Sequence, residues 1–88
     1  MTKSNLVKCC SVRVEYLTQI TEKAYKVRCF DGSEGIVPVS QVFGQDYEVG
    51  KSDAYWIAEW VLREKKLQYS SKKTAWFDKS TGERAPSK

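Results

Sequence analysis

The chain contains no histidine, and this absence excludes the most common class of general base. None of the familiar His-dependent triads can form without it. No glycine-rich phosphate loop is present either, because Gly32 and Gly35 are better explained by a hairpin. Asp46 and Glu48 lie in a polar stretch, where we expect solvated carboxylates rather than an acid–base pair. The sequence therefore predicts a protein that has no catalytic residues and is not an enzyme.

Cysteine is scarce and odd in number, with only Cys9, Cys10 and Cys29. An adjacent Cys-Cys pair is a poor disulfide framework, and the chain has no Cys-x-x-Cys motif. Without histidine, a zinc site would need carboxylates as further ligands. We therefore expect three reduced thiols, with Cys29 a small core residue, and we expect neither a metal nor a cofactor.

Long apolar runs are also missing from the sequence. No stretch of about 18 apolar residues occurs, so we expect no membrane-spanning segment. Residues 1–10 lack the apolar region of a signal peptide. These absences, together with the reduced thiols, lead us to expect a cytoplasmic protein that does not act at a membrane.

Hydrophobic residues make up 41% of the 88 residues, which is enough for one small domain with a modest core. Alternation of apolar and polar residues predicts strands over residues 12–16, 25–29 and 35–39. Asp31-Gly32 marks a tight turn between the last two. A polar stretch over residues 18–22 is typical of a turn, and we expect a loose connection over residues 40–53.

The second half of the chain has a mixed periodicity. Residues 55–57 could finish a strand, whereas apolar residues farther on recur at helical spacing. We expect a helix over roughly residues 57–67 and a short final strand over residues 74–77. Trp56 and Trp60 would share a helix face, and we expect one or both of them in the core.

Alternation and helical spacing together define an expected core, and its largest member is Trp60. Truncating Trp60 to Ala would then cost about 3–5 kcal/mol of stability. The expected core residues are Val12, Val14, Tyr25, Val27, Ile36, Ile57, Trp60 and Val61.

The predicted elements indicate a mainly-β or α+β fold. We expect a small antiparallel β-barrel-like domain, SH3-like or OB-like, with one short helix. The domain is expected to span residues 6–80, preceded by a disordered N-terminus over residues 1–5 and followed by a flexible tail over residues 81–88.

Charge is unevenly distributed along the chain. Residues 1–62 carry 7 Lys/Arg and 8 Asp/Glu, whereas residues 63–88 carry 8 Lys/Arg and 3 Asp/Glu. Aromatic residues are interleaved with these C-terminal cations, so the segment is expected to bind an acidic macromolecule. Trp76 and Phe77 could either be exposed or close the sheet as a last strand. The candidate partner-binding residues are Arg63, Lys65, Lys66, Lys72, Lys73, Trp76, Phe77 and Lys79.

Four segments of the chain follow a recognisable order. They read T-E-K-A-Y from Thr21, D-G from Asp31, P-V-S-Q-V from Pro38 and E-W…K-K-L from Glu59. In this respect the chain resembles a group of small phage- and mobile-element-associated proteins of uncharacterised function. The resemblance covers residues 21–67 and implies a similar fold, and it implies the host cell cytoplasm as the location. It implies no particular activity.

These observations favour a small non-catalytic binding module, most simply a phage or mobile-element accessory protein that acts by protein–protein interaction. One such role would be to inhibit a host defence nuclease by occupying its nucleic-acid-facing surface. The alternative is single-stranded nucleic-acid binding through the basic aromatic C-terminal segment, where bases stack and phosphates pair with cations.

A solvated helix face and tail would explain the same charges without a partner. A small-molecule ligand is not expected. Ser40 and Gln41 could present hydrogen bonds to a partner or satisfy a local turn.

Overall fold

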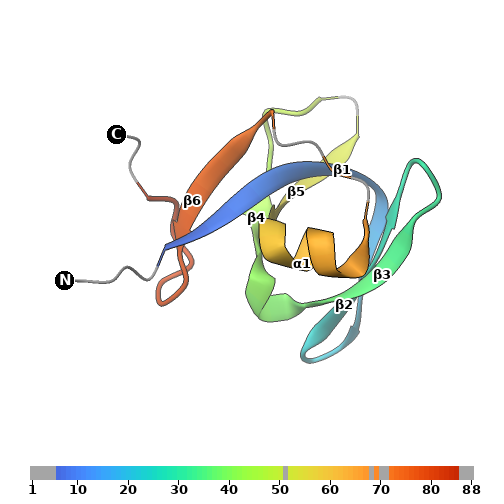
Figure 1. Cartoon of the computed structure of the whole chain (residues 1–88), viewed down its shortest axis with the longest axis horizontal. Coiled ribbons are helices and arrows are strands. Elements are labelled where there is room, and N and C mark those ends of the chain that lie inside the picture. The colour runs from blue at the N-terminus through green and yellow to red at the C-terminus, as the bar shows by residue number, and fades with distance from the viewer. Residues whose placement is uncertain (1–5, 51, 68, 70–71, 86–88) are drawn as a thin grey trace.

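The computed structural model describes residues 6–50, 52–67, 69 and 72–85. It contains one sheet, one α-helix and one short 3-10 helix, η1 (Figure 1). In chain order the elements are β1 (Leu6–Thr21), β2 (Ala24–Cys29), β3 (Glu34–Pro38), η1 (Val39–Gln41), β4 (Val42–Gln45), β5 (Asp53–Ala58), α1 (Glu59–Lys65) and β6 (Thr74–Asp78).

The 16-residue strand β1 organises the sheet because it pairs with three other strands. The strand order is β3-β2-β1-β5-β4, and β6 also pairs with β1. Residues 6–10 of β1 pair with β6, residues 9–14 pair with β5, and residues 14–21 pair with β2. All of these pairings are antiparallel, and Figure 1 shows β1 curving from β6 at one end to β2 at the other.

The prediction of a small, mainly-β fold with an antiparallel sheet and one short helix is confirmed. Within the described part of the chain, β3 and β4 end the path of paired strands and do not pair with each other. The sheet is therefore not closed into a barrel. In the same part of the chain, no helix has the length and apolarity needed to cross a membrane.

Two stretches that the sequence predicts as irregular are strands. Residues 18–21 continue β1 in a ribbon with β2, in which their side chains are mostly exposed and their polarity therefore gives no strand signal. Residues 42–45 form β4, which has no buried residue and hence no apolar alternation. The helix is also shorter than predicted, because β5 continues to Ala58 and Lys66 adopts a left-handed backbone with φ of 57° that ends α1.

The main hydrophobic core lies between the sheet and α1. Five of the expected core residues are confirmed in it: Val12, Val14, Val27, Ile57 and Val61. Tyr25 is partly buried against them. Cys29 is also fully buried, as predicted. Leu62 and Leu67 complete the helix side, and Gly35 on β3 leaves room there, because a Cβ at Gly35 would lie 3.3 Å from Leu67 Cδ2.

Two predicted core residues are exposed, so the prediction is wrong for them. Ile36 is 46% exposed because the alternation of β3 points its neighbour Val37 inward. Trp60 is 48% exposed because Val61 and Leu62 form the buried side of α1, and successive residues turn by about 100°. The large core anchor is Trp56 on β5, which is 5% exposed.

A second, smaller core lies on the other face of the sheet and includes two side chains of β6. Its buried members are Cys9, Trp56, Ala75 and Phe77, with Phe43 packed against them. Beyond β6 the chain folds back on this strand. Arg84 forms an isolated antiparallel β-bridge with Phe77, and the Ala85 N–H donates to the Trp76 carbonyl at 2.8 Å. Backbone contacts therefore connect residues up to Ala85 to β6. The predicted N-terminal segment 1–5 and residues 86–88 lie outside the described residues.

The opposite burial of two neighbours on α1 gives a paired prediction. Truncation of the fully buried Leu62 to Ala should cost about 2–5 kcal/mol of unfolding free energy. Trp60→Ala should cost less than about 1 kcal/mol, because half of its surface is already in water. Urea unfolding followed by circular dichroism measures both. Equal losses would contradict the placement of Trp60.

All three cysteines are buried and none forms a disulfide, and this burial protects their thiols. Burial, with a smaller contribution from Cys10, raises the pKa of Cys9 to about 12, and burial raises the pKa of Cys10 as well. Because the thiolate is the reactive form, iodoacetamide at pH 8 should leave the native protein unmodified. It should add three adducts in urea, as counted by intact mass. Native labelling as fast as labelling in urea would show the burial to be wrong.

Candidate partner-binding groove

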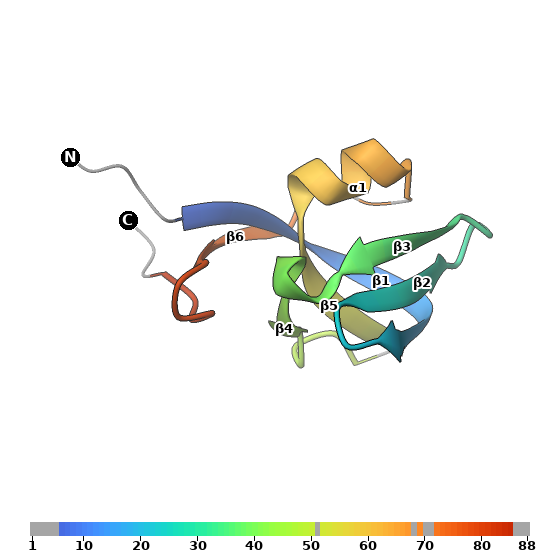
Figure 2. The ribbon, with the colours of Figure 1, turned by 90° about the horizontal axis from the view of Figure 1, so that it is seen from below.

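A shallow groove of about 360 Å³ is lined by residues from the beginning of β1, from α1 and from the turn after β6. Figure 2 shows α1 on one side of the sheet, above β1 and β3. We call this groove the Trp60 groove. It combines one large aromatic side chain with three cations and one carboxylate. Its lining residues are Leu6, Val7, Lys8, Glu59, Trp60, Arg63 and Lys79.

Trp60 forms the aromatic wall of the groove. It is the second residue of α1, and the burial of the next two residues leaves its ring on the solvent side. Its indole N–H donates a hydrogen bond to Gln41 Oε1 at 3.2 Å. The polar edge of the ring is therefore satisfied within the protein, and the exposed ring surface remains for a partner.

The charges in the groove are unevenly matched. Lys8 Nζ lies 3.9 Å from Glu59 Oε1, so these two side chains largely offset each other. Among the described residues, neither Arg63 nor Lys79 forms an ion pair. Arg63 follows Trp60 by three positions, which places the two side chains on neighbouring helix surface. The groove thus offers two unpaired cations beside an exposed indole.

The structure resolves the two alternatives for Trp76 and Phe77. Trp76 is the cross-strand partner of Lys8, so both side chains project from the same face of the sheet. Trp76 is 49% exposed and extends the apolar surface next to the groove. Phe77 projects from the other face, where it is buried and stacks on Phe43 with ring centroids 5.3 Å apart. Phe77 therefore packs in the smaller core and presents no surface to a partner.

The predicted basic set is divided in the structure. Arg63 and Lys79 line the Trp60 groove. Lys65, Lys66 and Lys72 are exposed but do not line it. The other five lining residues were not in the predicted set and come from the beginning of β1 and the first two residues of α1: Leu6, Val7, Lys8, Glu59 and Trp60. The spacing of Trp60 and Arg63 was the one local signal, whereas Lys8 reaches the groove through the pairing of β1 with β5, the strand that leads directly into α1.

Lys73 has a structural role that the sequence did not predict. Its Nζ lies 2.7 Å from Asp46 Oδ2 and 3.0 Å from Glu48 Oε1. Asp46 is 3% exposed, which corrects the expectation of a solvated carboxylate; only Glu48 is solvated. Asp46 also accepts hydrogen bonds from Ser11 Oγ at 2.5 Å and from the Glu48 N–H at 3.1 Å. We call Ser11, Asp46, Glu48 and Lys73 the Asp46 cluster.

The Asp46 cluster fixes the position of β6. The Ser11 N–H donates to the Lys73 carbonyl at 3.0 Å, and the Ser11 hydroxyl donates to Asp46, the carboxylate that pairs with the Lys73 side chain. Lys73 and Arg84 also lie against the ring of Trp56, with their charged atoms 5.8 and 5.0 Å from its centroid. Because β6 carries Trp76 and leads into Lys79, these contacts help to assemble the surface around the groove.

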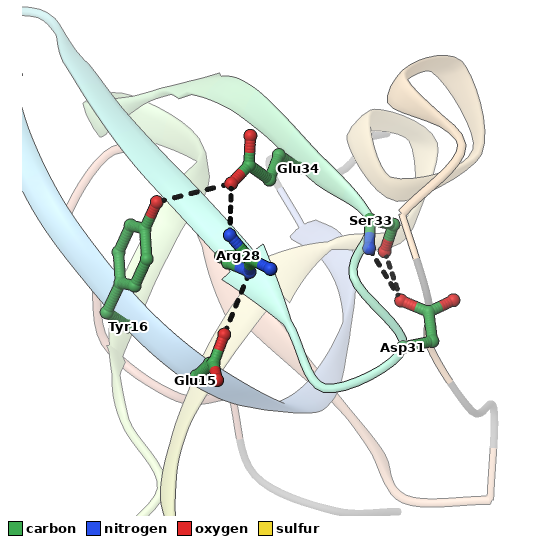
Figure 3. A network of polar contacts seen from close by, with 6 residues as sticks. All are labelled: Glu15, Tyr16, Arg28, Asp31, Ser33 and Glu34. Atoms are coloured by element: carbon green, nitrogen blue, oxygen red, sulfur yellow. Dashed lines mark hydrogen bonds and ion pairs between the residues drawn. The ribbon is translucent and has the colours of Figure 1, made fainter.

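A second polar network lies on the outer face of β1, β2 and β3 (Figure 3). Arg28 pairs with Glu15 at 2.9 Å and with Glu34 at 3.1 Å, and the Tyr16 hydroxyl donates to Glu34 at 3.4 Å. Two carboxylates share one cation, which leaves a net charge of −1, and the three charged side chains are substantially exposed. The network links three strands, and its one cation is already paired. Asp31 and Ser33 form a separate turn beside it.

No group of three or more His, Cys, Asp or Glu side chains in the described part of the chain is arranged to hold an ion.

Comparison with known proteins identifies no relative: no protein-family model matches the sequence, and no curated protein or solved structure is significantly similar to the chain. The resemblance to phage-associated proteins therefore stays a prediction.

The Asp46 cluster predicts a stability effect that depends on pH. Burial alone raises the pKa of Asp46, but hydrogen bonds from Lys73, Ser11 and the Glu48 N–H outweigh it and hold the pKa below its ordinary value. A lowered pKa in the folded state stabilises the fold above the unfolded pKa of about 4. This stabilisation is lost as the pH falls through the folded pKa.

Replacement of Asp46 by Asn should therefore cost about 1–3 kcal/mol at pH 7. The difference from the wild type should shrink toward pH 3. Urea unfolding at both pH values measures it, with Asp53→Asn as a control at an exposed carboxylate. An Asp46→Asn effect that is absent at pH 7, or equal at both pH values, would contradict the role given to this carboxylate.

Proposed function

We propose that this protein is a non-catalytic binding module that acts by protein–protein interaction through the Trp60 groove and the adjoining Trp76. The observation that carries the proposal is the convergence of two half-exposed tryptophans with Arg63 and Lys79 on one face of the molecule. Tryptophan and arginine are the residues most enriched among those that dominate binding energy at protein interfaces. The two unpaired cations favour an acidic surface on the partner.

We also propose an SH3-like or OB-like topology and an origin in a phage or mobile element. The SH3-like or OB-like assignment is supported by the long bent strand β1, since strands that bend and take part in two halves of a sheet are typical of small barrels and orthogonal sandwiches. A phage or mobile-element origin, the host cytoplasm as location and a host defence nuclease as partner are supported by the sequence resemblance and the small size alone.

Single-stranded nucleic acid is the second candidate partner. The specific observation in its favour is that Trp60 and Trp76 expose about half of their surface near cations, as stacking platforms do. Two other observations weigh against it. Lys73 is taken up by Asp46 and Glu48, and Phe77 is buried. Fewer cations and aromatic rings of the C-terminal segment are therefore available to bind a nucleic-acid strand than the sequence indicates.

An affinity capture with the tagged full chain tests the proposal. Lysate of a bacterial host is passed over the protein with and without nuclease treatment, and wild type is compared with Trp60→Ala and Arg63→Glu. We expect one protein to be recovered after nuclease treatment, and we expect each groove variant to reduce its recovery at least about tenfold. Tyr47→Ala is the matched control, since Tyr47 is 83% exposed and does not line the groove.

Two results would contradict the protein–protein proposal. One is recovery that the groove variants leave unchanged. The other is recovery that nuclease abolishes, joined with binding of a labelled single strand at low salt in fluorescence anisotropy. In that case the second candidate is favoured, and the salt dependence should flatten by about 0.7 in log–log slope for each phosphate contact removed.

A further inference from the structure

Two sequence motifs that are far apart in the chain meet in the structure. Gln41 is the last residue of η1, and Trp60 is near the start of α1. The pairing of Val42 with Ile57 places η1 beside the end of β5, directly before the helix. The backbone therefore brings the Gln41 amide to the Trp60 indole, and the two form a hydrogen bond of 3.2 Å.

This hydrogen bond restricts the orientation of an exposed ring. An exposed tryptophan with no polar partner would sample several rotamers, and ordering it on binding would weaken the affinity. With its N–H bound to Gln41, the ring of Trp60 remains against the groove, next to Arg63. Gln41 thus acts through Trp60, and the groove is preorganised before a partner arrives.

We infer that the Trp60 groove takes an acidic peptide segment with one apolar or aromatic side chain, and that Gln41 is the residue that positions Trp60 for it. The side chain packs on the ring of Trp60, and flanking carboxylates pair with Arg63 and Lys79. This inference rests on the proposed function and names the chemistry of the partner.

The size and charge of the groove favour a peptide. Its volume of about 360 Å³ is near the lower limit of ligand sites, which suits one or two side chains. Three cations and one carboxylate leave a modest positive charge, which fits a few partner carboxylates. A nucleic-acid strand needs a longer track of cations along successive phosphates, and Glu59 interrupts such a track here.

The indole N–H signals of the three tryptophans offer a direct test by two-dimensional 15N–1H NMR on the full chain. The probes are capped peptides of sequence EEFEE, EEGEE and KKFKK, together with an oligothymidylate. We expect EEFEE to shift the Trp60 signal in a saturable way while the buried Trp56 signal stays in place. EEGEE and KKFKK should bind at least about tenfold more weakly, because each lacks one of the two recognised features.

Variants separate the roles of charge and positioning. Arg63→Glu should weaken EEFEE binding about tenfold, whereas Lys26→Glu, an equal charge change at an exposed residue outside the groove, should leave it within about twofold. Gln41→Met removes the acceptor at similar side-chain length and should weaken binding about two- to tenfold. It should also increase solvent exchange of the Trp60 indole N–H.

Gln41→Glu keeps an acceptor and should restore slow exchange of the Trp60 indole, whatever its added charge does to peptide affinity. Gln45→Met is the matched control, since Gln45 lies on β4 and its amide contacts Asp53 instead. A merely structural role for Gln41 would lower the melting temperature of Gln41→Met without any change in indole exchange at 25 °C. That result would overturn the positioning role.

Equal shifts by EEFEE and KKFKK, or shifts by the oligothymidylate at lower concentration, would overturn the inferred partner chemistry. So would the absence of any shift with EEFEE. If EEFEE fails while Trp60→Ala and Arg63→Glu still abolish capture of a partner protein, the partner chemistry is wrong and the proposed function stands. If neither variant affects capture, the proposed function itself is wrong.

Discussion

Strand β1 is the physical constraint on which the other elements depend. In an antiparallel sheet, a strand with neighbours on both sides has its backbone groups bonded in both directions, and residues 9–10 and 14 of β1 are in that position. One continuous strand therefore ties the hairpin of β2 and β3, the pair of β4 and β5, and the late strand β6 into one body. The Trp60 groove lies at the beginning of this strand, where β6 and α1 both meet it.

The alternation of side chains along β1 also separates the two hydrophobic cores. Even-numbered residues such as Cys10 and Val12 face the helix and the main core, and Cys9 faces the smaller core beneath β6. The side chains of the adjacent Cys9 and Cys10 thus point to opposite faces of the sheet, which is consistent with the absence of a disulfide between them. The smaller core is supplemented by the Asp46 cluster, in which a buried carboxylate binds a lysine that precedes β6.

The three tryptophans show how the same residue type is divided between core and surface. Trp56 is buried by strand alternation, Trp60 is exposed by the rotation of the helix, and Trp76 is exposed on β6 while its neighbour Phe77 is buried. Gln41 then orients the exposed Trp60. The burial of Trp56, Val61 and Phe77 in the two cores thus determines that Trp60 and Trp76 face solvent.

Local patterns in the sequence predict the strands around Val27 and Phe77 and most of the small aliphatic core, because alternation is a local property. They could not predict β4, whose residues are only partly buried, or the start of the helix, since Trp56 and Trp60 fit a strand and a helix equally well. Most residues of the groove could not be predicted from the sequence for another reason. The groove depends on strand pairing across almost the whole chain, and the charge asymmetry identified only its Arg63 and Lys79.

Native-state hydrogen exchange of the β1 amides tests most directly whether this strand holds the fold and the groove together. Amides of residues 9, 10 and 14 should exchange only through global unfolding, with a free energy equal to that from urea denaturation. Amides at the far end of the β1–β2 ribbon, around residues 19–21, should exchange through local opening that requires less free energy than global unfolding. Exchange at residues 9 and 10 as fast as at residues 19–21 would contradict the account, because β6 would then not be docked on β1 and the surface around Trp60 would not be assembled.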